Sequence, residues 1–481
     1  MNFAIVRYLI GWMLGIESIF LLLPALTAVI YGEAELPAYL TAAAISLAGA
    51  ALLCHRKPKN TRFYAREGYV TVALCWLVLA VIGALPFVLS REIPFFIDAL
   101  FETVSGFTTT GATILGDVEA LSHASMLWRC LTHWVGGMGV LVFMLIVLPL
   151  AGGQTIFLMR AESPGPAVSK MSPHMRDTAT ILYAIYFGLT VLQMILLLIG
   201  GMPLFDAICV SLGTAGTGGF GNWNDSIAHY NSAYLQNVIT VFMILFGINF
   251  SAYFLILTRK FRQAFRIEEI RVYLGVIFVF AGLIAFNVRP MFGSLRESFH
   301  HALFQVASII TTTGFSTVDF DRWPTFSRAL LVLLMFIGAC AGSTGGGIKC
   351  SRILLLGKSV KKEMMCLIHP RLVRVNKMDG QRVPHEVMRS INVFVVAYAF
   401  IFILSLLIIS LNCEDLVTCF TSVATTLNNV GPGLSLCGST CNFDFFPPLS
   451  KCVLIFDMLA GRLELFPMLL LFTPGTWQRN K

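Results

Sequence analysis

The sequence carries little charge for its length. Only 12% of its 481 residues are Asp, Glu, Lys or Arg, whereas soluble domains usually have about twice that fraction. Hydrophobic residues make up 57% of the chain. So few charged side chains cannot cover the surface of a soluble globule of this size, and a water-soluble protein is therefore excluded.

Several motifs that carry chemistry in other proteins are also missing. The sequence has no GxGxxG fingerprint, no Walker P-loop and no phosphorylatable aspartate motif, so the chain itself is not expected to hydrolyse ATP. Its cysteines show no zinc-binding CxxC pairs, and no acid, base and nucleophile converge. We therefore expect neither an enzyme nor an organic cofactor. Cys437 and Cys441 share an expected outer loop, where a disulfide fits but two unpaired thiols are favoured.

Long apolar stretches are what the sequence has instead. Stretches of about 20 residues, enough to cross roughly 30 Å of hydrocarbon as a helix, recur along the chain. They predict an all-α integral membrane protein with ten crossings, of which the first is retained because no small-residue cleavage site follows it. The expected spans are Leu9–Tyr31, Ala38–Cys54, Val70–Leu89, Trp128–Leu150, Ile181–Gly200, Ala233–Leu257, Tyr273–Phe292, Leu330–Leu356, Ile391–Leu411 and Leu454–Phe472.

The distribution of Lys and Arg predicts the orientation. Most of the 34 basic residues fall into connections that would face one side of the membrane, with a dense group in residues 357–390. Because basic connections stay in the cytoplasm, we expect a multi-pass protein of the cell inner membrane with both termini cytoplasmic. The net charge of +8 follows from this topology, and no nucleic-acid partner is needed to explain it.

A fourfold repeat lies in the expected outer connections. After the third, fifth, seventh and ninth spans comes a segment too short to cross, and each unit reads span, short helix, Thr/Asn–Gly strand, span. The fourth unit needs one extra residue before its glycine in this alignment. The four segments are LFETVSGFTTTGAT, ICVSLGTAGTGGFG, LFQVASIITTTGFS and CFTSVATTLNNVGPG, aligned on Gly111, Gly219, Gly314 and Gly431.

Such segments suit a cation pathway. Non-helical backbone at membrane depth is tolerated only where it is buried in protein or lines water. Four strands around one axis can aim their carbonyl oxygens at a dehydrated cation, and the short helices would point their negative ends at it. Glycine supplies the backbone angles that this requires. The alternative, a simple turn between two helices, would explain one such segment but not four.

The repeat also predicts how the chain is divided. An N-terminal hairpin of two spans stands outside the four units, and a glycine-rich interruption falls within the third. The expected divisions are residues 1–68 for the hairpin and first cytoplasmic loop, 69–160 for unit 1, 161–266 for unit 2, 267–375 for unit 3 with the interruption, and 376–481 for unit 4.

The eighth span contains that interruption. Gly342–Gly347 reads Gly-Ser-Thr-Gly-Gly-Gly, and each glycine costs about 1 kcal/mol in a helix. We expect a flexible loop inside the membrane below the four strands, although glycines can also allow close helix packing.

The cations Lys349, Arg352 and Arg462 fall within expected spans. We expect Arg462 to project below the strands as an electrostatic barrier, with pairing to a carboxylate as the alternative. Lys349 could instead extend to the inner surface beside Arg352. Glu102 is expected to hold its short helix, and His133 is assigned no role.

The sequence resembles the Trk/Ktr/HKT superfamily of potassium transporters, and most of all its bacterial Trk membrane subunits. The resemblance covers nearly the whole chain. It rests on FETVSGFTTTGAT, HWVGGMGV, TAGTGGF, TTTGFST, GSTGGGIK, TTLNNVGPGL and GRLE.

This resemblance implies a potassium filter made of backbone carbonyls around a central pore. In the family a glycine in all four units accompanies potassium permeation, and serine in the first accompanies sodium, so Gly111 favours K⁺ as the transported ion. The filter residues implied are Thr109, Thr110 and Gly111; Thr217, Gly218 and Gly219; Thr312, Thr313 and Gly314; and Asn429, Val430 and Gly431.

The resemblance also implies a gate and partners. The gate would be an intramembrane loop with two nearby cations: Gly342, Ser343, Thr344, Gly345, Gly346, Gly347, Lys349 and Arg462. The partners would be membrane lipid, a second copy in a homodimer, and a cytoplasmic TrkA-like ring of nucleotide-binding RCK domains. Whether a proton or sodium ion travels with potassium stays open.

Three rival functions remain at this stage. A sodium-permeable or Na⁺/K⁺-cotransporting member of the same superfamily is the closest. A secondary transporter with inverted repeats would need units of alternating orientation, whereas all four units here run the same way. A membrane-embedded enzyme would need a cluster of catalytic side chains, which the sequence lacks.

Overall fold

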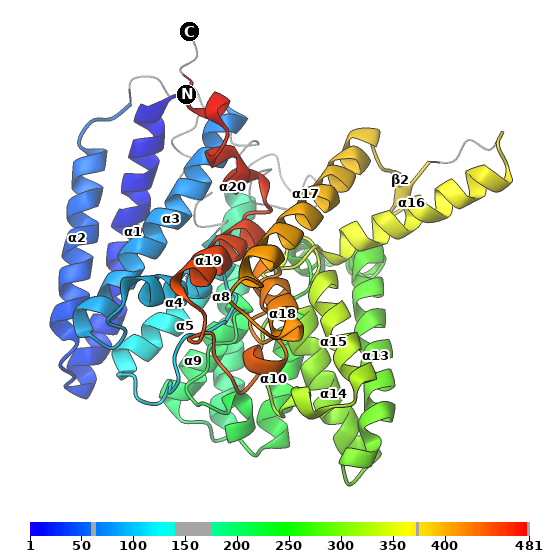
Figure 1. The fold of residues 1–481 in the computed structure, drawn as a ribbon, viewed down its shortest axis with the longest axis horizontal. Coiled ribbons are helices and arrows are strands. Elements are labelled where there is room, and N and C mark those ends of the chain that lie inside the picture. Colours follow the sequence, from blue (N-terminus) through cyan, green and yellow to red (C-terminus); the bar gives the residue numbers. More distant parts are fainter. Residues whose placement is uncertain (59–63, 140–174, 372–374, 479–481) are drawn as a thin grey trace.

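The computed structural model describes residues 1–58, 64–139, 175–371 and 375–478, and their regular secondary structure is almost entirely helical (Figure 1). The α-helices are α1 (Phe3–Tyr31), α2 (Leu36–Cys54), α3 (Ala65–Ser90), α4 (Phe96–Phe107), α5 (His123–Gly137), α8 (Met175–Ile199), α9 (Leu204–Gly216), α10 (Ala233–Phe246), α11 (Phe250–Leu257), α12 (Phe261–Ala264), α13 (Glu268–Val288), α14 (Leu295–Ile310), α15 (Thr325–Ile337), α16 (Cys350–Ile368), α17 (His385–Ile409), α18 (Leu416–Leu427), α19 (Pro448–Arg462) and α20 (Phe466–Leu471). One two-stranded antiparallel ladder pairs β1 (Lys377–Met378) with β2 (Gln381–Arg382).

Six helices in the described residues are long and apolar enough to cross a membrane, so a multi-pass helical protein is confirmed. They lie in α1, α2, α3, α8, α13 and α17. The pair α10 and α11 passes as a seventh span if taken together, but it bends by 92°. The expected spans 330–356 and 454–472 are each divided between two helices, α15 with α16 and α19 with α20. Most of the second half of the expected span 128–150 lies outside the described residues.

The bend between α10 and α11 has a visible cause. The carbonyl of Gly247 accepts from Cys340 N at 3.1 Å, and Phe250 N donates to the carbonyl of Gly342 at 3.0 Å. Asn249 caps α11, because its side chain accepts from Ser251 N at 2.8 Å. Backbone from the loop after α15 therefore occupies the places that helix hydrogen bonds would take.

The helices that precede the four Thr/Asn–Gly segments, α4, α9, α14 and α18, are too short to cross. They contain 12, 13, 16 and 12 residues, and 12 residues of helix span about 18 Å. Asp415 caps α18 by accepting from Val417 N and Thr418 N. The hydrogen bond from the Thr418 hydroxyl lowers the pKa of Asp415 to about 2, so this cap is charged at neutral pH.

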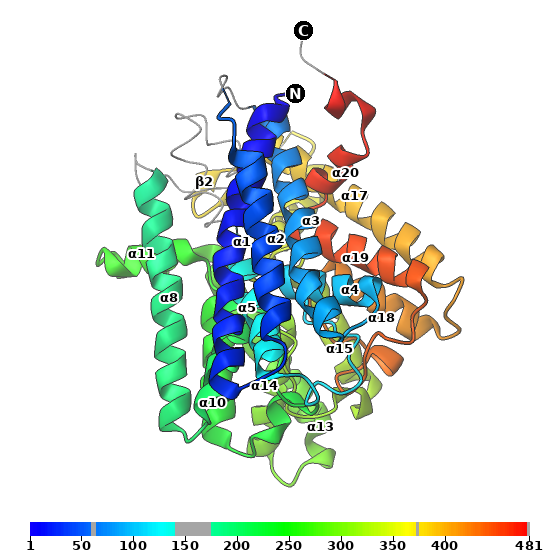
Figure 2. The same ribbon diagram turned by 90° about the vertical axis from the view of Figure 1, so that its left-hand side faces the viewer.

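The first two helices pack as a hairpin against the third helix and α5 (Figure 2). Ser46 on α2 donates to the carbonyl of Leu14 on α1 at 2.8 Å. Glu33, in the turn between them, accepts from His123 N at 2.7 Å and Ala124 N at 3.0 Å. A carboxylate at these positions satisfies the free N–H groups at the start of α5.

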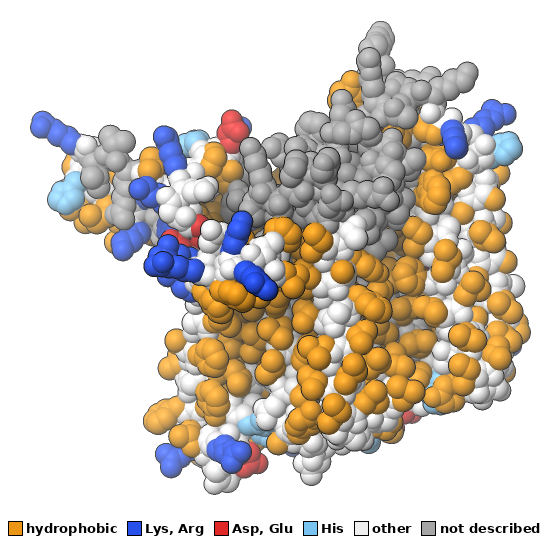
Figure 3. Space-filling model, turned by 180° about the vertical axis from the view of Figure 1, so that it is seen from behind, with side chains coloured by type: hydrophobic (Ala, Val, Ile, Leu, Met, Phe, Trp, Pro, Cys, Tyr) orange, Lys and Arg blue, Asp and Glu red, His pale blue; other side chains and the backbone are white. Residues whose placement is uncertain are grey.

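The surface agrees with a membrane environment. Large hydrophobic side chains are widely exposed, among them Ile30 at 70%, Phe286 at 76% and Leu411 at 76%. In Figure 3 hydrophobic side chains cover the middle of the face in view, and Lys and Arg gather toward its upper and lower edges. The two ends of the described chain meet on one face, where the Met1 amino group donates to the Gln478 carbonyl at 3.0 Å.

Candidate functional site

Each of the four short helices ends in the same backbone turn. The residue two positions before each aligned glycine is left-handed, with φ of 55° at Thr109, 58° at Thr217, 58° at Thr312 and 55° at Asn429. The residue after it donates back to a carbonyl five positions earlier in all four cases: Thr110 to Ser105, Gly218 to Gly213, Thr313 to Ser308, and Val430 to Thr425, at 2.8–3.0 Å. This is the Schellman pattern of a helix end. Three of the four left-handed residues are Thr, a β-branched residue that rarely adopts positive φ, and the fourth is Asn, which adopts it more readily.

The fourth unit needs no insertion near its glycine. Helices α4 and α18 have the same length, and Phe107 and Leu427 end them at the same distance from Gly111 and Gly431. The extra residue that the sequence alignment required therefore does not lie in the short helix or its turn.

The four turns lie edge to edge in a closed ring. We call Thr109–Gly111, Thr217–Gly219, Thr312–Gly314 and Asn429–Gly431 the ring segments. A Cβ added to the glycine of each segment would collide with the middle carbonyl oxygen of the next segment. The pairs are Gly111 with Gly218, Gly219 with Thr313, Gly314 with Val430, and Gly431 with Thr110. The glycines have positive φ of 75–98°, so both space and backbone angle exclude a side chain there.

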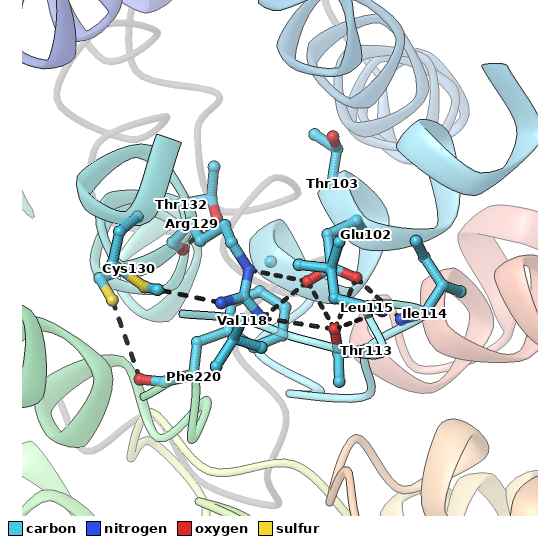
Figure 4. A network of polar contacts seen from close by, with 12 residues as sticks. Glu102, Thr103, Thr113, Ile114, Leu115, Val118, Arg129, Cys130, Thr132 and Phe220 are labelled. Atoms are coloured by element: carbon cyan, nitrogen blue, oxygen red, sulfur yellow. Dashed lines mark hydrogen bonds and ion pairs between the residues drawn. The ribbon is translucent and has the colours of Figure 1, made fainter. Parts of the chain in front are cut away.

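A buried ion pair anchors the chain that follows the first ring segment (Figure 4). Arg129 on α5 donates to Glu102 on α4 at 2.8 Å, and both side chains are buried. Glu102 also accepts from the Thr113 hydroxyl and from Ile114 N, each at 3.0 Å. The carboxylate thus ties the chain leaving Gly111 to the short helix before it. The expected structural role of Glu102 fits this geometry, whereas its buried cation partner was not foreseen.

His133 joins the first unit to the second. Its Nδ1 lies 2.7 Å from the Gly106 carbonyl, and its Nε2 lies 3.2 Å from Phe220 N. Since a carbonyl only accepts and an amide N–H only donates, the His133 imidazole is neutral and carries its proton on Nδ1. The His133 imidazole also packs against Gly218, where an added Cβ would collide with it. His133 is therefore a support of the second ring segment, a role that the sequence did not suggest.

Asn429 closes the ring between the fourth and first units. Its side-chain amide donates to the Thr110 hydroxyl at 3.0 Å and to the Met458 carbonyl on α19 at 2.9 Å. An asparagine in place of threonine at this position therefore adds a contact that crosses between units.

A non-helical stretch, residues 338–349, separates α15 from α16 and packs against the ring; we call it the glycine-rich loop. Gly346 N donates to the Thr312 hydroxyl at 2.6 Å. A Cβ on Gly345 would meet the Thr311 carbonyl at 2.9 Å, and one on Gly346 would meet Asn429 Cβ at 3.0 Å. The loop therefore lies directly against the third and fourth units.

The two expected cations both hold this loop. Arg462 donates to the Thr344 carbonyl at 2.7 Å and to the Gly136 carbonyl, at the end of α5, at 2.7 Å. Lys349 is buried and its ammonium donates to the Gly345 carbonyl. Extension of Lys349 to the inner surface is thus not what the structure shows. The neighbouring Arg352 forms an ion pair with Glu464.

Glu269, at the start of α13, is a further residue of the site. Its carboxylate is 2% exposed and accepts from Ala341 N at 2.6 Å and Ser351 N at 3.0 Å. One side chain thus brackets both ends of the glycine-rich loop. Sequence reasoning missed it, because Glu269 is separated from these partners by more than 70 residues and the residues around it read only as an ordinary helix start.

Among the described residues no group of His, Cys, Asp and Glu could hold a metal ion. Cys437 and Cys441 are both unbonded. The polar groups that converge at the site are thus backbone carbonyls, threonine hydroxyls and the loop contacts given above.

The sequence and the fold are similar to those of known membrane transport proteins. The TrkH family, described as "Cation transport protein", matches residues 38–280 and 279–478. The Trk system potassium uptake protein TrkH of Salmonella typhimurium is 38% identical over 99% of this chain and 100% of its own length. TrkG of Escherichia coli K12 is 33% identical over 98% of each chain. The crystal structure of the potassium transporter TrkH from Vibrio parahaemolyticus superposes with a TM-score of 0.89 at 33% identity, covering 99% of this chain and 100% of that one. The chain therefore belongs to the TrkH family of cation transport proteins.

Proposed function

We propose that this protein takes up potassium across the bacterial inner membrane through the ring of backbone carbonyls. The observation that carries the proposal is the closed ring, in which four glycines each abut the carbonyl of the next unit. The relatives described above are named potassium uptake proteins. Four sets of oxygens on one axis can replace the water shell of a cation.

The selectivity of this pathway would come from backbone. Thr109 to Gly111 and their counterparts are fixed by the helix-end turns, so the oxygens need little rearrangement when an ion arrives. The helices α4, α9, α14 and α18 end at the ring, and their C-terminal partial charges would attract a cation. The membrane potential would supply about 2.3 kcal/mol per charge for each 100 mV.

The glycine-rich loop would act as the gate. It packs against the third and fourth ring segments and is held by Arg462, Lys349 and Glu269. Its glycines allow backbone rearrangement that other residues would resist. Opening would release the Thr344 carbonyl from Arg462, which would move a positive charge relative to the pathway.

The finer expectations about topology and partners belong to the same proposal. They are ten crossings with four half-membrane helices, the five divisions of the chain given above, cytoplasmic termini, a homodimer and a nucleotide-binding RCK partner. The basic residues between Lys358 and Arg389 would offer that partner a docking surface on the cytoplasmic side.

Flux measurements in liposomes test the proposal. Gly111→Ser and Gly314→Ser place a side chain where an added Cβ meets a carbonyl of the neighbouring unit. Strain of about 1–3 kcal/mol at such a position should lower the potassium-to-sodium flux ratio about fivefold or more. Gly188→Ser on α8 is the control, because an added Cβ there meets nothing within 4 Å.

Two results would count against the proposal. An unchanged ratio in both ring variants, with normal protein yield, would mean that the ring does not select the ion. Equal potassium and sodium flux in the unaltered protein would favour the sodium-permeable alternative.

A further inference from the structure

Four cysteines of the fourth unit lie outside its ring segment. Cys413 lies in the linker between α17 and α18, Cys419 lies in the first turns of α18, and Cys437 and Cys441 follow the ring segment. Cys419 and Cys437 are buried, Cys413 is half-buried and Cys441 is exposed. None of the functions proposed above uses a thiol.

Two of these thiols are already neighbours. Cys419 Sγ donates to the Cys413 carbonyl oxygen at 3.6 Å, and Cys413 Sγ donates to the Asp415 carbonyl oxygen at 3.6 Å. The linker curls around the start of α18 because Asp415, between the two cysteines, caps that helix. This curl brings together two residues that a straight chain would hold far apart.

We propose that Cys413 and Cys419 form a dithiol that closes to a disulfide on the outer face of the protein. The proposal rests on the outward orientation of this linker, where the compartment is oxidising, and it is otherwise independent of the proposed ion pathway. The bond would fasten the linker to the start of α18, whose far end leads into the Asn429 ring segment.

The chemistry needs only a small disulfide such as glutathione disulfide. The half-buried Cys413, as thiolate, attacks one sulfur of that disulfide and releases one glutathione thiolate. Cys419 then attacks the Cys413 sulfur of the mixed disulfide and releases the second. The two thiol protons pass to the two glutathione molecules, so the protein loses two electrons and two protons while glutathione disulfide is reduced.

Another pair of neighbouring thiols serves as an internal control. Cys130 on α5 and Cys209 on α9 also lie in one buried cluster, but both are 0% exposed. No oxidant can reach either sulfur in the folded protein, so this pair is expected to stay reduced. Comparing the two pairs therefore separates the effect of oxidant access from the effect of the distance between the two thiols.

Peptide mapping of the purified full-length protein tests the bond. The protein in detergent is equilibrated with oxidised or reduced glutathione, unfolded in an excess of alkylating agent, and cleaved at Glu414 and Asp415, which separates Cys413 from Cys419. Chymotryptic cleavage at Phe420 then separates Cys419 from Cys437 and Cys441. Oxidation should yield joined peptides that contain Cys413 and Cys419, with both cysteines missing from the alkylated pool, while Cys130 and Cys209 are alkylated in full.

Variants and intact cells complete the test. Cys413→Ser or Cys419→Ser should abolish the joined peptides, and Cys437→Ser should leave them. Alkylation of intact cells before lysis should reveal the same bond. The proposal is overturned if Cys413 and Cys419 remain alkylated under oxidising conditions, if the bond joins Cys437 or Cys441 instead, or if cells contain only the reduced pair.

Discussion

At the scale of single residues, buried carboxylates in this protein have very different surroundings. Glu102 faces Arg129 and accepts three kinds of hydrogen bond. Glu17, in the middle of α1, is 3% exposed, and neither of its oxygens has a hydrogen-bond partner within the described part of the chain. Burial of an unpaired polar group costs about 1–3 kcal/mol. Glu17 should therefore lower the stability of the fold, whereas Glu102 should raise it.

The same substitution at both positions tests this difference. Glu17→Met should leave thermal stability unchanged or raise it, because an apolar side chain suits the apolar surroundings formed by Met13, Trp76 and Phe107. Glu102→Met should lower stability by about 3–5 kcal/mol, because Arg129 is left buried without its counter-charge. Melting temperatures in detergent compare the two. A large loss of stability in Glu17→Met would show that its carboxyl holds a partner.

At the scale of elements, the glycine-rich loop is held from both ends. Glu269 accepts from Ala341 N and Ser351 N, and Arg462 holds the middle of the loop at Thr344. A buried N–H left without a partner costs about 1–3 kcal/mol. Loss of the Glu269 carboxylate should therefore favour conformations in which the loop leaves its place.

Glu269→Ala should raise basal cation flux about tenfold without changing the potassium-to-sodium ratio, since 1.4 kcal/mol corresponds to a factor of ten. Glu268→Ala is the matched control. The neighbouring Glu268 is half-buried and pairs with Lys358 outside the loop, so its removal should leave flux unchanged. Flux is measured in liposomes without any regulatory subunit. A fall in flux, or an altered potassium-to-sodium ratio, would contradict the inference that Glu269 holds the glycine-rich loop in place.

The sequence predicted the ends of the short helices, whose cause lies in neighbouring residues, but not the break between α10 and α11, whose cause lies far along the chain. The four Thr/Asn–Gly segments predict the ends of the short helices, because each contains a glycine with positive φ and the same motif recurs in all four units. The break between α10 and α11 had no such signal, since its cause is the remote backbone of Cys340 and Gly342. The structure brings all twelve ring residues together with the loop, but their role in ion passage stays a prediction.

At the scale of the whole molecule, the fold class and the family were within reach of the sequence. Composition predicted a helical membrane protein, and the repeat motifs predicted the family that the comparisons show. Side-chain supports such as Arg129 and His133 were not within reach, because each joins segments that are distant along the chain. The sequence alone records no such pairing.

The expected orientation leads to a labelling experiment. In intact cells a membrane-impermeant maleimide should modify the exposed Cys441 from outside. A cysteine introduced at the exposed Lys361 of α16, in a Cys441→Ser background, should react only after the membrane is opened. Labelling in the reverse order would show that the expected topology is wrong. The Cys413–Cys419 pair would then lie on the cytoplasmic side and not on the outer face as proposed.

The ring is sealed by contacts between the two ends of the chain. Asn429 reaches Thr110 across 319 residues, and Lys451 pairs with Asp98 across 353 at 2.6 Å. Contacts so distant in sequence form late. During synthesis, the first three units emerge with one side of the ring open, because the contacts of the fourth unit cannot yet form. On the proposed ion pathway, a nascent or prematurely terminated chain would lack a closed ring and would not conduct, so the cell would be protected from ion leakage while the protein is being made.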